Sequence, residues 1–502
     1  GEVGVNGVVV NLYRADGLGN PTGASIATDT TTGGGFYLFD DLSPRDYVVV
    51  ITQTNFASGG PLAGYWSSAT SLTGAGATTE TAAPDADIVA TDADDNGTRD
   101  VSGGAFNGAV LSRAITLGPS GGTEPTGEIA AQLESGVLGN QGNQPDDRAN
   151  MTVDFGFYRV EIGNLVYLDA NGNGNYDGAP DSVLPGATVR LFASNGTTEI
   201  NVGLDGILGT ADDAAGGMLT DAGGLYRFAG LPAGDYIVNV GSPTGLTSTI
   251  DTYSPADSTD PDTNVDNNDN GIGVGFGTVS ANTLTMSAGE VAANVTVTNA
   301  NGTTVDTTVD FGFIGMVAIG NRVWFDTGVG GGISNNGILD GGETGVPNLT
   351  VELYTSTGTF VTSTTTDASG YYQFDQLYPG TYYVFIPASQ FQTGGALEDY
   401  FSSVGNGITE TSDENVDENG IDNAAPATNG IRSIDYILTP GTEQTGENQS
   451  NYMGVLADNS VNFTADFGFT QKYSLGNRVW FDTDNSSTIN GSEVGIDGVT
   501  VN

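Results

Sequence analysis

The residues of this chain best suited to chemistry stand in short runs of Asp, Asn and Gly. In the loop pattern that proteins use for calcium, oxygen side chains at positions 1, 3, 5, 9 and 12 face one ion, and Gly at position 6 allows the turn. The last such run fills those five positions with Asp482, Asp484, Ser486, Asn490 and Glu493. Ser487 replaces the Gly. This spacing predicts a Ca²⁺ site built from carboxylate, amide and hydroxyl oxygens.

Two further runs place oxygen side chains in the same order. One consists of Asp169, Asn171, Asn173, Asp177 and Asp181, and the other, spread by an insertion, of Asp326, Asn336, Asp340 and Glu343. Glu2 aligns with Glu493 and is a further candidate ligand. An isolated Asp-Asn-Gly run is typical of a plain turn. The three runs follow the same kind of strand, however, and this shared placement favours cation loops.

A second set of acidic runs lies in the middle of each repeat. Its candidate ligands are Asp92, Asp94, Asn96 and Asp100, then Asp266, Asn268 and Asn270, then Asn415, Asp417 and Asn419. A third kind of run occurs once, with Asp205, Asp212 and Asp213 as candidates. Each mid-repeat run places oxygen side chains at alternate positions before a Gly, so we predict that these runs also bind cations.

Composition excludes many other functions. There are 61 Asp+Glu against 12 Lys+Arg, a net charge of -49, and neither Cys nor His. Such acidity argues against nucleic acid as a partner, and without Cys or His the chain can form no disulfide and no Ser-His-Asp triad. Two carboxylates about 4 Å apart repel by roughly 4 kcal/mol at an effective dielectric of about 20. Bound Ca²⁺ would remove that repulsion, and a salt-adapted surface is a compatible alternative.

Internal repeats set the organisation of the chain. The run Thr-Val-Asp-Phe-Gly-Phe around Asp154 returns around Asp310 and, with Ala for Val, around Asp466, so the spacing is 310 − 154 = 156 and 466 − 310 = 156. Kinases use Asp-Phe-Gly to bind magnesium, but without His the accompanying catalytic loop cannot form. We therefore expect these Phe side chains to face a core. No run approaches the roughly 20 apolar residues of a membrane span.

Alternating apolar residues predict strands throughout. Tyr226-x-Phe228, a Pro-containing turn and Tyr236-x-Val238 recur in each repeat, and we interpret this pattern as a hairpin with one buried face. The predicted fold class is all-β, with tandem Ig-like or transthyretin-like β-sandwich repeats in an extended rod. The predicted domains are 1–158, lacking its first strand, 159–314, 315–470, and 471–502, which holds the opening strand and calcium loop of a further repeat.

The end of the chain repeats its beginning, because residues 492–502 match residues 1–11 in phase. One explanation is that a longer repetitive protein is cut at an arbitrary point. The alternative is that residues 473–502 supply the missing strand of the next molecule's first repeat, which would make a donor-strand polymer.

The order of these motifs resembles that of the SdrD B-like repeats of bacterial surface proteins, relatives of the Cna-B stalk domains. The motifs are Ile162-Gly163-Asn164, the run from Asp169 to Gly174, Pro185-Gly186, and Gly224-x-Tyr226-x-Phe228. The resemblance implies a β-sandwich, calcium in the loops and a rod that projects from a cell. Two departures stand out: the repeats are longer, and the single Lys, Lys472, excludes a Lys-Asn isopeptide bond in every repeat.

Together these observations predict an extracellular, bacterial cell-surface structural protein. We expect a non-enzymatic stalk or filament that calcium makes rigid, with calcium ions and self-association, or neighbouring repeats of the same chain, as its partners. An adhesin that binds a protein or a glycan is the alternative. An exposed aromatic patch on one repeat only would favour it. An enzyme would need an acid pair in a cleft.

Overall fold

The computed structural model describes residues 3–87, 94–118, 124–125, 142, 144–249, 267, 269–272, 278–281, 284–286, 303–404, 418–446 and 451–501. Over these ranges the chain is almost entirely strand and turn, and the α-helix found there, α2 (Pro426–Asn429), is one turn long. The all-β fold class is therefore confirmed. The chain divides into two compact units, Gly1–Gly315 and Met316–Asn502. No helix among the described residues is long and apolar enough to cross a membrane.

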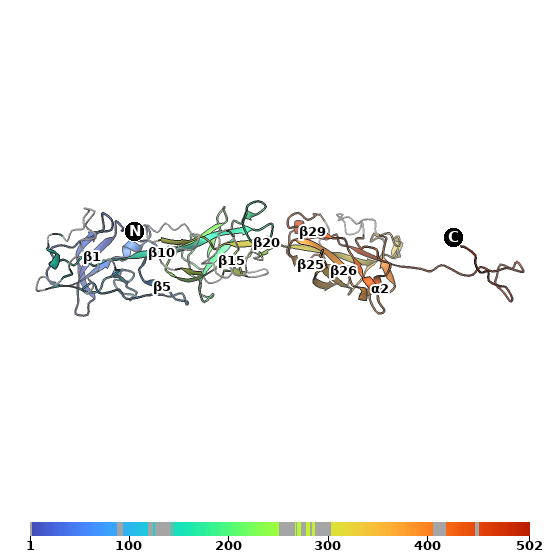
Figure 1. Cartoon of the computed structure of the whole chain (residues 1–502), viewed down its shortest axis with the longest axis horizontal. Helices are drawn as coiled ribbons and strands as arrows, with labels where there is room; N and C mark the ends of the chain where they lie inside the picture. The colour runs from blue at the N-terminus through green and yellow to red at the C-terminus, as the bar shows by residue number, and fades with distance from the viewer. Residues whose placement is uncertain are drawn as a thin grey trace. The chain divides into compact units, whose positions relative to one another are not determined.

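The second unit is a sandwich of two sheets. One sheet has the order β22 (Thr344–Gly345), β21 (Val317–Phe325), β31 (Phe467–Gln471) and β27 (Tyr400–Ser402), with β25 (Tyr371–Leu377) and β30 (Val461–Asn462) also paired with β21. The other has the order β24 (Phe360–Thr365), β23 (Thr350–Thr355), β26 (Gly380–Ile386) and β28 (Ile431–Arg432), with β29 (Tyr436–Leu438) on β26. Figure 1 labels β25, β26 and β29 in this unit.

The alternation of side chains explains this sandwich. On β23, Val351 and Leu353 are fully buried, whereas Thr350, Glu352 and Tyr354, which alternate with them, are partly exposed. The two buried residues pack in one core with Phe374 on β25 and Phe467 on β31, from the opposite sheet. Because strand side chains alternate between faces, each strand contributes every second residue to the core. Trp324 is also fully buried, as its place in an alternating strand predicts.

The second half of the first unit repeats this design. One sheet contains β11 (Ser182–Val183), β10 (Phe157–Leu168), β20 (Phe311–Gly315) and β16 (Leu246–Ser248), with β14 (Leu225–Leu231), β19 (Thr303–Asp306) and β4 (Trp66–Ser67) on β10. The other contains β13 (Met218–Leu219), β12 (Thr188–Ala193), β15 (Gly234–Gly241) and β17 (Thr278–Ser280), with β18 (Leu284–Met286) on β15. Its core again contains buried side chains from both sheets.

The first half of this unit has one sheet of the same order. It contains β2 (Pro21–Thr30), β1 (Val9–Ala15), β3 (Arg45–Ile51), β8 (Val110–Leu111) and β7 (Thr98–Arg99), with β9 (Ile115–Leu117) on β3; β5 (Thr70–Leu72) and β6 (Thr78–Glu80) form a separate hairpin. The segment around Tyr37, which corresponds to β14 and β25, forms only an isolated bridge between Thr32 and Phe36.

The predicted hairpin is wrong in its pairing. β14 pairs with β10 and β15 pairs with β12, so the two strands lie in opposite sheets, and β25 and β26 are separated in the same way. The turn between them crosses the sandwich instead of folding back within one sheet. A tyrosine closes it: the hydroxyl of Tyr236 donates to the carbonyl of Pro232 (2.6 Å), and that of Tyr382 to Tyr378 (2.8 Å).

A single strand, β10, serves both halves of the first unit (Figure 1). The boundary between the predicted domains 1–158 and 159–314 lies inside this strand. At its start it pairs with β4, and farther along it pairs with β14, β19 and β20. Trp66 Nε1 donates to the carbonyl of Gly230 (2.8 Å), and the N–H of Leu72 donates to that of Ala233 (2.7 Å). The two halves are therefore joined by backbone pairing and not by a flexible segment.

The tyrosine that closes the crossing turn provides a test of the fold. Replacing Tyr382 with Phe removes one hydrogen bond in a largely buried place, and we expect the free energy of unfolding of the second unit to fall by about 1 kcal/mol. Chemical denaturation of the full chain measures this. The neighbouring change Tyr383→Phe, on the outer face, is the control, and equal loss in both variants would contradict the role given to Tyr382.

Candidate cation loops

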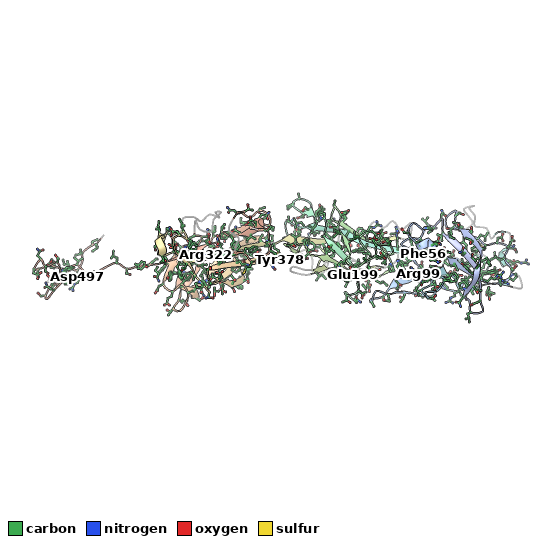
Figure 2. All side chains as sticks on the ribbon, turned by 180° about the vertical axis from the view of Figure 1, so that it is seen from behind. Phe56, Arg99, Glu199, Arg322, Tyr378 and Asp497 are labelled. Carbon is green, nitrogen blue, oxygen red and sulfur yellow. The ribbon has the colours of Figure 1, made fainter. Side chains whose placement is uncertain are left out.

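The loop near the end of the chain brings its predicted ligands together. Carboxylate oxygens of Asp482, Asp484 and Glu493 lie within 4.8 Å of one another. Asp482 accepts hydrogen bonds from the N–H groups of Ser486 (3.0 Å) and Ser487 (2.9 Å). The loop is therefore closed by the acid that begins it. It lies in the segment that contains Asp497, labelled in Figure 2, most of whose side chains are exposed.

The same set of hydrogen bonds shapes all three predicted loops. The first acid accepts the N–H of the residue at the glycine position: Asp169 from Gly174 (2.7 Å), Asp326 from Gly337 (2.9 Å) and Asp482 from Ser487 (2.9 Å). The last acid accepts the N–H of the residue after the first: Asp181 from Ala170 (2.9 Å), Glu343 from Thr327 (2.7 Å) and Glu493 from Thr483 (2.9 Å). Asp181 lies one residue beyond position 12 of the calcium-loop pattern, and an insertion precedes Asn336, but neither changes this arrangement of hydrogen bonds.

Amide side chains lie among the acids in each loop. Asn171 and Asn173 donate from Nδ2 to Asp177, Asn336 donates to Asp340, and Asn490 donates to Asp484 and Ser486, at 3.0 to 3.3 Å. In each bond the NH₂ group of the asparagine faces the acceptor oxygen. Rotating the amide by 180° would exchange its NH₂ group and its oxygen. A bound cation would favour the flipped amide, with the oxygen turned towards the carboxylates.

The first acids of two of these loops are buried, and no salt bridge among the described residues involves an acid of the three loops. Asp169 and Asp326 are fully buried, and the salt bridges of Glu161, Glu199 and Asp435 all lie outside the loops. Burial raises the pKa of Asp181, with Asp169 nearby, and likewise that of Glu343, with Asp326 nearby. In the exposed terminal loop, hydrogen bonds from Asn490 and Ser486 lower the pKa of Asp484.

The mid-repeat asparagines make a contact that their spacing does not predict. Oδ1 of Asn96, Asn270 and Asn419 accepts the N–H of Asp154 (3.0 Å), Asp310 (2.7 Å) and Asp466 (2.9 Å) respectively, and each Asn donates its own N–H to the carbonyl of the same partner. Each turn is thereby fastened to the Asp-Phe-Gly segment at the end of its repeat. Asp92, Asp266, Asn268, Asn415, Asp417 and Glu2 lie outside the described residues.

The acid directly before each of these asparagines was missed by the sequence reasoning. Asp95, Asp269 and Glu418 each accept the N–H of the glycine two residues on, at 2.7 to 3.0 Å, and Asp269 is fully buried. The alternate spacing predicts ligands at every second residue from the start of each run, and these acids fall between the predicted positions. The recurrence of Asp/Glu-Asn-Gly in all three repeats is the signal that would have found it.

In the second repeat the two kinds of loop meet. The N–H of Asp269 donates to the carbonyl of Gly174 (2.8 Å), and that of Tyr176 donates to the carbonyl of Asn267 (2.8 Å). The fully buried Tyr167 lies nearby; burial and then the charges of Asp269, Asp310, Asp169 and Asp181 raise its pKa far above the ordinary range. Acidic groups from both loops therefore gather at one end of this repeat.

The remaining candidates are exposed or partly buried. Asp205, Asp212 and Asp213 form an exposed turn whose carboxylates accept N–H groups of that same turn, and a hydrogen bond from Thr210 lowers the pKa of Asp212. Asp100 accepts the N–H of Ser102 (2.8 Å), and Oδ1 of Asp94 is buried.

The residue at the glycine position of the loops is open to test. Gly174 and Gly337 have φ of 81° and 70°, and Ser487 has 60°, a left-handed conformation that costs a non-glycine residue roughly 1 kcal/mol or more. We expect Ser487→Gly to bind the calcium probe Tb³⁺ severalfold more tightly at the terminal loop, measured by luminescence titration. Ser492→Gly serves as the control. A weaker or unchanged affinity in Ser487→Gly alone would contradict the predicted loop geometry.

The asparagine contact gives a second test. Asn419 is fully buried, so Asn419→Ala leaves the N–H of Asp466 without this acceptor and should lower the free energy of unfolding of the second unit by about 1–3 kcal/mol. The loss should be the same with calcium and with a chelator, whereas a loss confined to calcium would indicate a ligand. The exposed Asn429→Ala is the matched control.

The fold and the loops define a tandem β-sandwich repeat protein with acidic loops between strands. Residues 160–290 and 317–434 match the model of the SdrD B-like domain. Those two regions are SdrD B-like domains, which confirms the resemblance.

Several proteins are similar to this chain in sequence. Serine-aspartate repeat-containing protein F of Staphylococcus epidermidis is 30% identical over 358 residues, which are 70% of this chain and 15% of that protein. Serine-aspartate repeat-containing protein D of Staphylococcus aureus (strain MW2) is 28% identical, with 70% and 20% covered, and Colossin-B of Dictyostelium discoideum is 26% identical, with 76% and 10% covered. The chain thus spans a fifth or less of the length of these relatives.

Among solved structures, a streptococcal ancillary pilin is similar at 8% sequence identity and a TM-score of 0.19, with 63% of each chain covered. A TM-score this low supports no conclusion about fold or function. The β-sandwich assignment rests instead on the strand pairing and the shared cores described above.

Proposed function

We propose that this chain is a structural segment of an extracellular, bacterial cell-surface protein, a stalk or filament whose repeats are made rigid by calcium. The observation that carries the proposal is the single hydrogen-bond arrangement shared by three loops of different sequence and length. Loops that serve only as turns have no need to preserve the positions of both terminal acids. Loops that hold an ion do.

The residues present fit an oxygen-seeking dication. The loops offer carboxylate, amide and hydroxyl oxygens only, which are the donors that calcium prefers. The holders would be Asp169, Asn171, Asn173, Asp177 and Asp181 in one loop, Asp326, Asn336, Asp340 and Glu343 in the next, and Asp482, Asp484, Ser486, Asn490 and Glu493 in the last. A bound ion would neutralise carboxylates that otherwise repel one another across short distances.

The position of the loops within each repeat supports a mechanical role. The strand that enters the repeat pairs in parallel with the strand that leaves it: β10 with β20, and β21 with β31. Pulling on the two ends of a repeat would therefore shear this pair, loading its hydrogen bonds together instead of one at a time. Asp169 donates its N–H to Phe313, and Asp326 to Phe469, both at 2.8 Å. Each loop thus begins where it is tied to the leaving strand.

Thermal unfolding tests this proposal. With an affinity of about 0.1 mM and about 1 mM calcium, each site would add roughly 1.4 kcal/mol to stability, so excess chelator should lower the melting temperature of the full chain. Adding calcium back should restore the melting temperature, and sodium chloride at matched ionic strength should not. An unchanged melting temperature would refute a stabilising role for calcium and leave the acidic runs as ordinary turns.

One observation favours an adhesive role as a second candidate. On the outer face of the second unit, Tyr354 and Tyr383 are stacked with ring centres 5.4 Å apart, and Phe360 beside them is 53% exposed. In the first repeat, Val48 and Val50, which correspond to Tyr383 and Phe385, are buried. Binding of the full chain to a glycan or protein array, lost in Phe360→Ser and retained in the exposed Val361→Thr, would support adhesion; binding unaffected by Phe360→Ser would rule out this face.

A further inference from the structure

The terminal segment carries a second copy of an entering strand, with its apolar side chains uncovered. Residues 476–483 are identical in sequence to residues 320–327, which begin within β21. In β21, Val323 is fully buried in the core of the second unit. Its counterpart Val479 is 40% exposed, and the preceding apolar residue, Leu475, is fully exposed. The same strand sequence is therefore buried in one place and solvent-exposed in the other.

The entering strand has two partners in the second and third repeats. It pairs antiparallel with β14 or β25 and parallel with β20 or β31. The corresponding segments of the first repeat are residues 36–42 and residues 153–157. Among the described residues no strand pairs with both of these segments. The first repeat thus offers two partners for a strand like that at residues 475–481.

The apolar side chains on these two segments are incompletely covered. They contact the core of the first repeat but are only partly buried: Tyr37, Phe39 and Phe155. Their counterparts in the third repeat, where β21 covers them, are no more than 3% exposed: Tyr372, Phe374 and Phe467. Covering apolar surface of this kind is favourable, at roughly 25 cal/mol per Å². An inserted strand would supply that cover.

The surroundings of the entering strand are already formed in the first repeat. The hydroxyl of Tyr37 donates to the carbonyl of Val153 (2.7 Å), so the two partner segments are held together. Gly4 packs so closely on Gly34 that a Cβ atom would meet the carbonyl oxygen of Gly34. Both contacts recur in the third repeat, around β21. Insertion of a strand therefore requires little rearrangement of the acceptor, which favours association.

We propose that residues 475–481 of one copy of this chain insert into the first repeat of a second copy, between residues 36–42 and 153–157. Main-chain pairing would provide affinity, and the alternating apolar side chains would fix the register. Each copy carries a donor strand and an acceptor repeat, so the contact is head-to-tail and can continue from copy to copy. The inference rests on the proposed function in one respect: it gives the proposed filament a means of lengthening.

The pairing of β21 predicts the register of the inserted strand. Ile319 lies opposite Phe374 and Arg322 opposite Tyr371, both in antiparallel pairing. Transferred to the first repeat, this register places Leu475 opposite Phe39 and Arg478 opposite Phe36. In the terminal segment, Trp480 now forms a bridge with Gly495, as Trp324 does with Gly345 in β21 and β22. Gly4 of the acceptor corresponds to Gly345, so insertion would exchange one bridge of Trp480 for another.

Disulfide formation between two full-length variants tests this register. The chain has no Cys, and residues directly opposite in antiparallel strands have Cα atoms about 4.5–5.5 Å apart, within the range of a disulfide. When the Phe36→Cys and Arg478→Cys chains are mixed and mildly oxidised, we expect a covalent dimer, with the linkage identified by peptide mapping. The exposed Tyr473→Cys, outside the inserted strand, is the control partner for Phe36→Cys.

Two results of the disulfide experiment would overturn the proposal. One is a yield of mixed dimer no higher with Arg478→Cys than with the control partner. The other is a disulfide that forms within a single chain carrying both cysteines but not between two chains, because the terminal strand would then occupy the first repeat of its own chain.

Sedimentation of the full chain at increasing concentration tests association without a covalent link. The unaltered chain should form head-to-tail oligomers in calcium and in chelator alike. Val479→Asp should weaken association by about tenfold or more, because an unpaired carboxylate would enter the acceptor core. Val499→Asp is the matched control: Val499 is 46% exposed and lies outside the inserted strand. Equal association of the two variants, or an unaltered chain that stays monomeric, would overturn strand insertion.

The two proposals fail in different ways. Oligomers in chelator, together with a melting temperature that does not respond to calcium, would refute the stabilising role of calcium and leave strand insertion standing. A melting temperature that responds to calcium, in a chain that stays monomeric at every concentration, would support the calcium loops and refute strand insertion.

Discussion

The parallel pairing of the entering strand with the leaving strand is the interaction on which the second and third repeats depend. Where it is present, in β10 with β20 and in β21 with β31, the entering strand also pairs with β14 or β25, and the aromatic side chains of those strands are buried. Phe228 and Phe374 are no more than 3% exposed. In the described part of the first repeat no strand takes this place, and Tyr37 and Phe39 are only partly buried. The core of a repeat is therefore completed by its first strand, β10 or β21.

The acidic loops follow from the same topology. A strand that enters the sandwich beside the last strand must be followed by a connection at the end of the sheet, and that connection is the Asp-rich loop. The Asp-Phe-Gly segment and the mid-repeat turn reach that end from elsewhere in the sequence. Carboxylates from three segments are thus brought together by strand order alone, and their mutual repulsion makes the assembly sensitive to whatever positive charge is available.

Much of this was accessible from the sequence, and the failures have physical causes. The repeat spacing and the strand alternation predicted the sandwich. The loop spacing predicted one site for Asp482, Asp484 and Glu493, whose carboxylates lie close together in the structure. The predicted hairpin is wrong because the sequence pattern does not distinguish two arrangements. Two alternating strands joined by a Pro-containing turn have the same pattern whether they pair in one sheet or lie in opposite sheets across a core. The mid-repeat loops were assigned by spacing alone. The partner of Asn419 is Asp466, a distant residue, and only the tertiary fold shows that its oxygen is already engaged.

The continuity of β10 limits how this chain can change over evolutionary time. A loop between domains tolerates insertions and deletions, but side chains in a strand alternate with a period of two. One residue added between Tyr158 and Ile162 would turn the inward side chains of the following strand outward and expose Ile162, which is now fully buried. Single-residue changes in length should therefore be eliminated at this junction. Growth of such a protein by duplication must proceed in whole repeats, with the register of the strand carried intact from one copy to the next.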